Sequence, residues 1–135
     1  MKKHIYLISF VLFTSLVITM SSIPDLHTPH IPDKLAPDKI AHFIQYFIFA
    51  FLYYKFRASR GFAKKEVLIE LTFLGIMISI ANELYQTMIP GRTFSWWDAM
   101  ANLSGFAGFI IIFQIKCYFI NNIFLVSEKS PTFNR

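Results

Sequence analysis

Four apolar stretches, each long enough to cross a lipid bilayer, account for most of this 135-residue chain. They run from Ile5 to Ile23, Ile40 to Phe56, Val67 to Ile89 and Trp97 to Ile115. A helix needs about 20 mainly apolar residues to span the hydrocarbon core, and 55% of the residues here are hydrophobic. Little chain is left for a water-soluble domain. The sequence therefore predicts an all-α membrane protein folded as a four-helix transmembrane bundle.

The same stretches define the predicted domain organisation. We expect one transmembrane domain over residues 1–126 and a short disordered cytoplasmic tail over residues 127–135. The first stretch follows a basic start and ends near Ser21 and Ser22, as a secretory signal would. It lacks an A-x-A cleavage site and its apolar run is long. A retained first helix is therefore the prediction, with cleavage as the alternative.

The basic residues predict the orientation of these helices. They gather before the first stretch, between the second and third, and after the fourth: Lys2, Lys3, Lys55, Arg57, Arg60, Lys64, Lys65, Lys116, Lys129 and Arg135. The other two connections hold only Lys34, Lys39 and Arg92. Since cytoplasmic loops carry the excess of Lys and Arg, both termini are predicted to be cytoplasmic. This distribution explains the net charge of +5 without a nucleic-acid partner, and none is predicted.

Polar residues interrupt the apolar stretches at one depth. His42, Gln45 and Tyr46 come early in the second stretch, whereas Asn82, Glu83 and Gln86 come late in the third, and Asp98 and Asn102 come early in the fourth. Because neighbouring helices run in opposite directions, all of these residues are predicted to lie near the outer face. Ionisable groups inside a membrane generally mark a functional site. The sequence thus predicts a polar pocket open to the outside.

The residue types suggest roles within that pocket. The candidate catalytic residues are His42 as general acid or base, with Glu83 or Asp98 setting its tautomer and charge. Lys39 and Arg92 are expected to hold a phosphate or carboxylate. The candidate substrate-binding residues are Asp38, Lys39, Gln45, Tyr46, Asn82, Gln86, Arg92 and Asn102.

Structural interpretations compete with these roles. Asp38 could be a helix N-cap, Asp98 could be the acid of a capping box that begins at Ser95, and Arg92 could simply pair with Asp98. Gly105 and Gly108 are read as packing positions, and Glu66 and Glu70 as structural groups at the cytoplasmic start of the third helix.

Two further features concern metals and disulfides. The single cysteine, Cys117, excludes an internal disulfide and a Cys-based metal cluster. His27 and His30 lie in the external loop, where we interpret them as solvated. The same loop contains a tandem repeat, residues 32–36 and 37–41, whose first copy could form a turn of interfacial helix. No cofactor or metal is predicted, although a metal-assisted site of His42, Glu83 and Asp98 stays open.

The order of these motifs resembles a known family. Asp38-Lys39-x-x-His42-x-x-x-Tyr46, Glu83-x-x-Gln86 and Pro90-Gly91-Arg92, followed by Asp98, Asn102, Gly105 and Gly108, are similar to the VanZ-like family of bacterial membrane proteins. The resemblance covers residues 38–108. It implies a multi-pass protein of the bacterial cytoplasmic membrane, with its motif face outside, and an association with resistance to the lipoglycopeptide teicoplanin.

Three classes of function are compatible with these observations. The protein could bind an amphiphilic envelope lipid or lipoglycopeptide, in teicoplanin-type resistance or envelope homeostasis. It could instead be an acid–base or metal-assisted transferase or hydrolase that acts on a lipid-linked phosphate or carboxylate. A small transporter is the weaker alternative, because polar residues are sparse in the cytoplasmic halves of the second and fourth stretches and form no continuous polar path. The expected partners are membrane lipids, with a lipid-linked envelope precursor or lipoglycopeptide as ligand, and an oligomer is compatible with the sequence.

Overall fold

A computed structural model describes residues 2–24 and 37–128. The described residues form four helices, α1 (Lys2–Ser21), α2 (Pro37–Ser59), α3 (Lys64–Gln86) and α4 (Trp96–Glu128), and contain no strand. The all-α prediction is therefore confirmed. The first copy of the tandem repeat, His27, His30 and residues 129–135 lie outside the described residues, whereas residues 127 and 128 of the predicted tail belong to α4.

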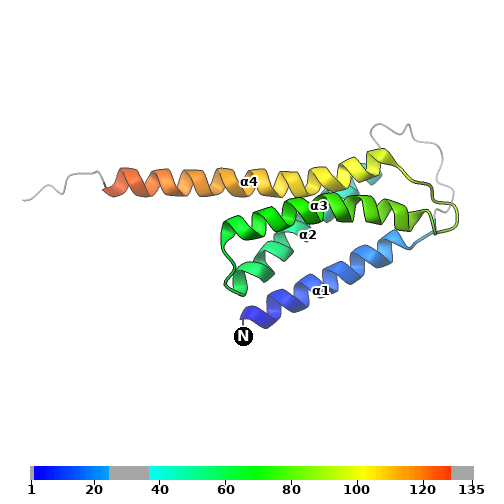
Figure 1. Cartoon of the computed structure of the whole chain (residues 1–135), viewed down its shortest axis with the longest axis horizontal. Helices are drawn as coiled ribbons and strands as arrows, with labels where there is room; N and C mark the ends of the chain where they lie inside the picture. The colour runs from blue at the N-terminus through cyan, green and yellow to red at the C-terminus, as the bar shows by residue number, and fades with distance from the viewer. Residues whose placement is uncertain (1, 25–36, 129–135) are drawn as a thin grey trace, which may run out of the picture.

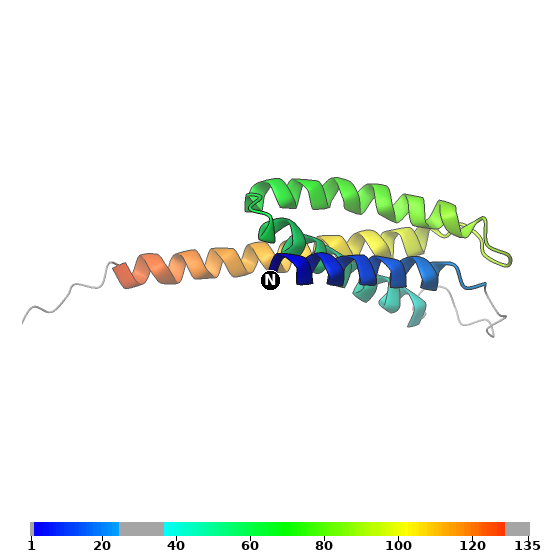
Figure 2. The ribbon, with the colours of Figure 1, turned by 90° about the horizontal axis from the view of Figure 1, so that it is seen from below.

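Helices α3 and α4 lie alongside each other, and α2 runs at an angle to them (Figures 1 and 2). Helix α2 contacts the other three helices and packs most extensively on α4, while α3 packs on α4 and α1 packs on α2. The end of α1, the start of α2 and the link between α3 and α4 share one end of the bundle, at the right of Figure 1. The turn between α2 and α3 lies at the opposite end, and α4 extends beyond it.

Three of the helices, α1, α3 and α4, are long and apolar enough to cross a membrane. Helix α2 differs because it carries His42, Gln45, Lys55 and Arg57 within its length. Its inward face is nevertheless well packed, since Tyr46 and Ala50 are essentially buried. The lower hydropathy of α2 is compatible with its central position, because its polar side chains can contact other helices there.

Large apolar side chains cover the outside of the bundle. They include Leu12, Phe73, Met77, Ile112 and Ile123, each more than half exposed. An apolar surface this extensive is unfavourable in water and suits contact with lipid tails. The exterior therefore agrees with a membrane environment, whereas the polar side chains described below turn inward.

Two glycines set how closely α4 approaches its neighbours. A Cβ on Gly105 would lie 2.5 Å from the backbone oxygen of Phe43 and 2.9 Å from the backbone nitrogen of Phe47. At Gly75 of α3, a Cβ would meet the ring of Phe106, 3.0 Å away. The predicted packing role of Gly105 is confirmed, because only a residue without a side chain lets α2 and α4 approach this closely.

The end of the bundle at the α2–α3 turn is held by a compact ion pair. Glu70 accepts hydrogen bonds from Nε of Arg57 at 2.8 Å, from the Tyr53 hydroxyl at 2.9 Å and from a second nitrogen of Arg57. Glu66 accepts the backbone N–H of Ala63 at 3.0 Å. Both carboxylates stabilise the start of α3 and its link to α2, which confirms the structural roles predicted for them.

Replacing Gly105 with alanine tests the close contact between α2 and α4. Alanine favours a helix by about 1 kcal/mol over glycine, yet overpacking against a backbone costs about 1–3 kcal/mol. We expect Gly105→Ala to lower the free energy of unfolding, measured by SDS titration of detergent-solubilised protein. Gly108→Ala is the matched control, because its Cβ would meet only the rings of Phe43 and Phe47. Equal stability of the two variants would show that α2 and α4 are not in close contact at Gly105.

Candidate functional site

A hydrogen-bonded polar cluster joins all four helices at the end of the bundle where α1 ends and α2 begins. Its members are buried to an unusual degree for such residues: Glu83 and Asn102 are 0% exposed, Gln86 is 2% exposed and His42 is 7% exposed. The helices alternate in direction, so residues late in α3 meet residues early in α2 and α4 (Figure 1). The structure therefore brings together most of the residues that the sequence pattern singles out.

Glu83 is the centre of this cluster. Its Oε1 atom accepts the side-chain amide N–H of Asn102 at 3.4 Å and that of Asn82 at 3.5 Å. Hydrogen bonds to a carboxylate are stronger than those between neutral groups. The carboxylate of α3 thereby holds α4 through Asn102.

Each amide that contacts Glu83 is itself positioned by another helix. The Oδ1 atom of Asn82 accepts the hydroxyl of Ser21 at 2.8 Å, and Oδ1 of Asn102 lies 2.9 Å from Nδ1 of His42. Two chains of hydrogen bonds, one from α1 and one from α2, thus end on the same carboxylate. The sequence pattern suggests a direct His42–Glu83 pair, and the structure places Asn102 between them.

Two acids and a lysine lie on the other side of His42. The Nε2 atom of His42 is 3.6 Å from a carboxylate oxygen of Asp38, one turn earlier in α2. Nζ of Lys39 lies 2.9 Å from Oδ1 of Asp98, and the side chains of this ion pair are only 19% and 12% exposed. Asp38 lies in the first turn of α2, which begins at Pro37, so it is a helical residue rather than the N-cap.

The capping box at the start of α4 is present in part. The backbone N–H of Asp98 donates to Oγ of Ser95 at 3.3 Å, as expected for the N-cap residue. The carboxylate of Asp98 faces Lys39 instead of closing the box. Asp98 therefore combines a position in the first helical turn with a contact to α2.

Arg92 contacts different groups from those considered in the sequence. Its guanidinium donates to Oε1 of Gln86 at 3.1 Å and to the backbone oxygen of Ile23 at 3.4 Å. The suggested pairing of Arg92 with Asp98 is therefore wrong, because Asp98 is occupied by Lys39. Within residues 2–24 and 37–128, Arg92 has no carboxylate partner.

Several buried polar atoms in this region lack a hydrogen-bond partner within the described part of the chain. They are the Tyr46 hydroxyl, Oγ of Ser79, Oε2 of Glu83 and Nε2 of Gln86. Gln45, a predicted binding residue, is half-buried on α2 and has no side-chain hydrogen bond to any described residue. These groups have unused hydrogen-bonding capacity, although the four unpartnered atoms are enclosed by protein.

Sequence reasoning missed the contribution of α1. Ser21 is 5% exposed and binds Asn82, and the hydroxyl of Ser22 lies 2.8 Å from that of Tyr85 on α3. In the sequence these serines resemble the end of a signal peptide. Their predicted depth in the membrane could have assigned them to the site, because the first apolar stretch ends on the same side of the membrane as the other polar residues.

An apolar groove adjoins the polar cluster on the side of α1. It has a volume of about 380 Å³ and is lined by Thr14, Val17, Ile18, Tyr46, Phe49, Ile78, Ala81, Asn82 and Tyr85. Two of these residues, Tyr46 and Asn82, also belong to the polar region around Glu83. The groove and the polar cluster therefore share a wall.

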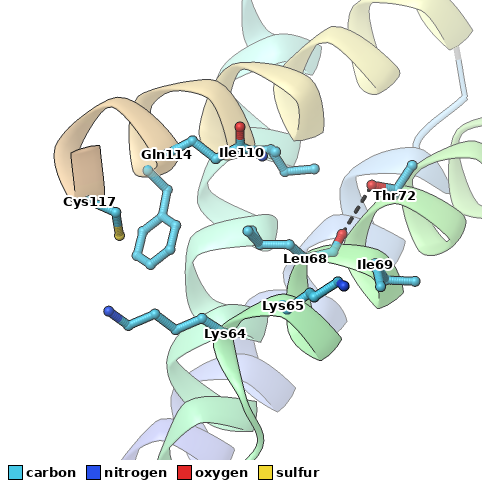
Figure 3. Close-up of a pocket in the computed structure, with 9 residues that line it drawn as sticks. Lys64, Lys65, Leu68, Ile69, Thr72, Ile110, Gln114 and Cys117 are labelled. Carbon is cyan, nitrogen blue, oxygen red and sulfur yellow. Dashed lines mark hydrogen bonds between the residues drawn. The ribbon is translucent and has the colours of Figure 1, made fainter. Parts of the chain in front are cut away.

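A second cavity, of about 440 Å³, lies at the other end of α3 (Figure 3). Lys64 and Lys65 from the start of α3 and Gln114 and Cys117 from α4 line it, together with apolar side chains. None of the predicted site residues lines this cavity. The candidate site is the smaller cavity, because only that one adjoins the buried ionisable groups.

The fold and the polar cluster define an all-α, multi-pass membrane protein with ionisable groups buried at one end of the bundle. Comparison with protein families refines this class: the VanZ/LLP1 family model matches residues 2–118, and the chain therefore belongs to the VanZ/LLP1 family. No curated protein and no solved structure matches the chain.

Removing the Asn102 side chain tests the geometry of the cluster. Asn102→Ala deletes the contacts to both His42 and Glu83 and leaves both groups buried, which costs about 1–3 kcal/mol for each unpaired group. We expect a lower melting temperature in detergent, followed by circular dichroism. Asn121→Ala, an exposed position on the same helix, is the control and is expected to change stability by less than about 0.5 kcal/mol. Equal melting temperatures for the two variants would contradict this arrangement.

Proposed function

We propose that this protein binds an amphiphile of the bacterial cell envelope, such as an envelope lipid or a lipoglycopeptide. The anionic head group would lie at the edge of the polar cluster, beside Arg92 and Lys39, and the acyl chain would occupy the groove between α1 and α3. The observation that carries this proposal is the shared wall of the two, since Tyr46 and Asn82 line the groove and adjoin Glu83.

The groove has the chemistry and the opening that an acyl chain needs. Its lining is mainly aliphatic and aromatic, from Val17, Ile18, Phe49 and Ile78. Helix α1 packs chiefly on α2. Among the described residues, its side-chain hydrogen bonds to α3 are made by its last residue, Ser21, and by Ser22 directly after it. Beyond those bonds, the groove lies between α1 and α3. This position would let an acyl chain enter it sideways from the lipid.

Two cations favour an anionic head group. Arg92 contacts only an amide oxygen and a backbone oxygen in the described structure, so its guanidinium remains available for a phosphate or carboxylate. Lys39 pairs with Asp98 and can turn its ammonium to a ligand at the same edge. The unpartnered hydroxyl of Tyr46 and amide nitrogen of Gln86 add donors to this region.

The proposed orientation places the polar cluster at the outer face of the cytoplasmic membrane, with α2 as a fourth span and both termini in the cytoplasm. Three observations support it. The basic residues concentrate at the opposite end of the bundle, α2 has the same length as α3, and α2 lies between the three apolar helices.

Catalysis on the bound amphiphile is the second candidate, favoured by the relay from His42 through Asn102 to Glu83. Such a relay orients the imidazole and leaves Nε2 free to take or give a proton. A water molecule would then be the nucleophile, because no Ser, Thr or Cys side chain is hydrogen-bonded to His42 in the described residues. The candidate catalytic residues are His42, Glu83 and Asp98.

Native mass spectrometry of purified protein tests this proposal. Envelope lipids and a lipoglycopeptide are offered to the wild type and to Arg92→Ala, Lys39→Ala and Ala81→Phe. We expect an amphiphile that stays bound to the wild type, about tenfold weaker binding to each cation variant, and loss of binding to Ala81→Phe, because the introduced ring fills the groove. Ala107→Phe, at an exposed position on α4, is the matched control and should bind normally.

The masses also separate the two candidate functions. A ligand retained unchanged supports binding, and a ligand converted to a new mass by the wild type but not by His42→Ala supports catalysis. Wild-type affinity for the same ligand in Arg92→Ala, Lys39→Ala and Ala81→Phe would contradict the placement of the head group beside the two cations and of the acyl chain in the groove.

A further inference from the structure

Three potential metal ligands converge at the start of α2 and α4. Asp38, His42 and Asp98 each offer one ligand atom, and these atoms all lie within 4.8 Å of one another. The set differs from the one considered in the sequence, because Asp38 takes the place of Glu83, which lies behind Asn102. One imidazole and two carboxylates match the preferences of divalent transition metals.

The hydrogen bonds around His42 fix which nitrogen faces this cluster. Asn102 donates its amide N–H to Glu83, so its oxygen is turned toward Nδ1 of His42. An amide oxygen can only accept a hydrogen bond, and Nδ1 must therefore carry a proton. In the neutral imidazole, Nε2 then presents a lone pair.

That lone pair faces a carboxylate. Nε2 is 3.6 Å from Asp38 and makes no hydrogen bond within the described residues, although the His42 side chain is only 8% exposed. Two acceptors directed at each other repel unless a proton or a metal cation lies between them. The almost wholly buried imidazole of His42 is thus held by Asn102 on one side and directs Nε2 at Asp38 on the other, across a gap that a cation can fill.

The charges of the neighbouring groups leave a deficit of cations. Asp38, Asp98 and Glu83 face His42 or its partners, whereas Lys39 is the one lysine or arginine paired with any of the three in the described structure. Lys39 contacts Oδ1 of Asp98, and the second oxygen of this carboxylate stays available. A bound cation would offset the remaining negative charge beside His42 and Asp98, which are both buried.

We propose that Asp38, His42 and Asp98 bind one divalent transition-metal ion, with Zn²⁺ as the simplest probe. The positioning of His42 by Asn102 matches the way metal-ligating histidines donate their other N–H to a fixed acceptor. Ligands of Zn²⁺ lie about 2.0–2.2 Å from the ion, so the cluster must contract on binding. Asp38 can supply this movement, because its side chain is 55% exposed.

Three protein ligands leave a coordination position open. The anionic head group described above is a suitable occupant, a point that rests on the proposed function. Binding of the ion itself depends only on the three side chains.

The experiment measures Zn²⁺ and Co²⁺ binding to full-length, metal-stripped protein in detergent. All variants carry His27→Gln and His30→Gln, so that the histidines of the external loop do not contribute. We expect about one Zn²⁺ per chain after dialysis, as for a single site with three protein ligands, and Co²⁺ absorption bands of a nitrogen- and oxygen-ligated ion. His42→Gln and Asp98→Asn should each weaken binding at least tenfold, and Asn102→Ala about 10- to 100-fold.

Matched controls separate the site from unspecific binding and from misfolding. His4→Gln changes an exposed histidine in α1 and should bind Zn²⁺ like the parent protein. Asp98→Asn can still accept the hydrogen bond of Lys39, so its helix content, measured by circular dichroism, should stay unchanged. Absence of stoichiometric Zn²⁺ in the parent, or parental affinity in a folded Asp98→Asn protein, would overturn the proposal whatever the outcome of the amphiphile experiment.

Discussion

The convergence of two hydrogen-bond chains on the carboxylate of Glu83 is the interaction on which the rest of the site depends. One chain starts at Ser21 of α1 and passes through Asn82, and the other starts at His42 of α2 and passes through Asn102 of α4. In each chain every donor points toward Glu83, so the groups polarise one another in the same sense. Burying the carboxylate alone would be costly, and these donors offset that cost while fixing the relative heights of four helices.

The polar cluster and the apolar exterior impose opposite demands, and α2 satisfies both. Gly105 lets α2 approach α4 closely enough for His42 to reach Asn102 one turn away. The rings of Tyr46, Phe49 and Phe106 pack below that contact, with centroids 5.6–6.3 Å apart. Helix α1 packs less extensively, mainly on α2, and the groove beside it is the consequence. The same weak packing that opens the groove gives an amphiphile access to the polar end.

The sequence predicts the helices and the location of the site better than it predicts the contacts within it. Apolar run length identifies all four helices, although the last apolar stretch ends at Ile115 and α4 continues to Glu128. Lys116 interrupts that stretch, but the residues that follow it are again mainly apolar. Depth correctly groups His42, Glu83 and Asn102. The hydrogen-bond and ion-pair partners within the site could not be deduced from the sequence. Asp98 pairs with Lys39 rather than Arg92 because of how α2 and α4 are rotated about their axes, which the sequence does not show. Ser21 is not assigned to the site from the sequence, because at the end of the first apolar stretch it resembles the end of a signal peptide.

A double-mutant cycle between Ser21 and His42 tests the central role of Glu83 most directly. These side chains belong to different helices and are linked through the chains that end on Glu83. The free energies of unfolding of Ser21→Ala, His42→Ala and the double variant give their coupling. A shared acceptor predicts a coupling energy above about 0.5 kcal/mol in the wild-type background and none when Glu83 is replaced by leucine. Additive effects in the wild-type background would contradict a network that depends on Glu83.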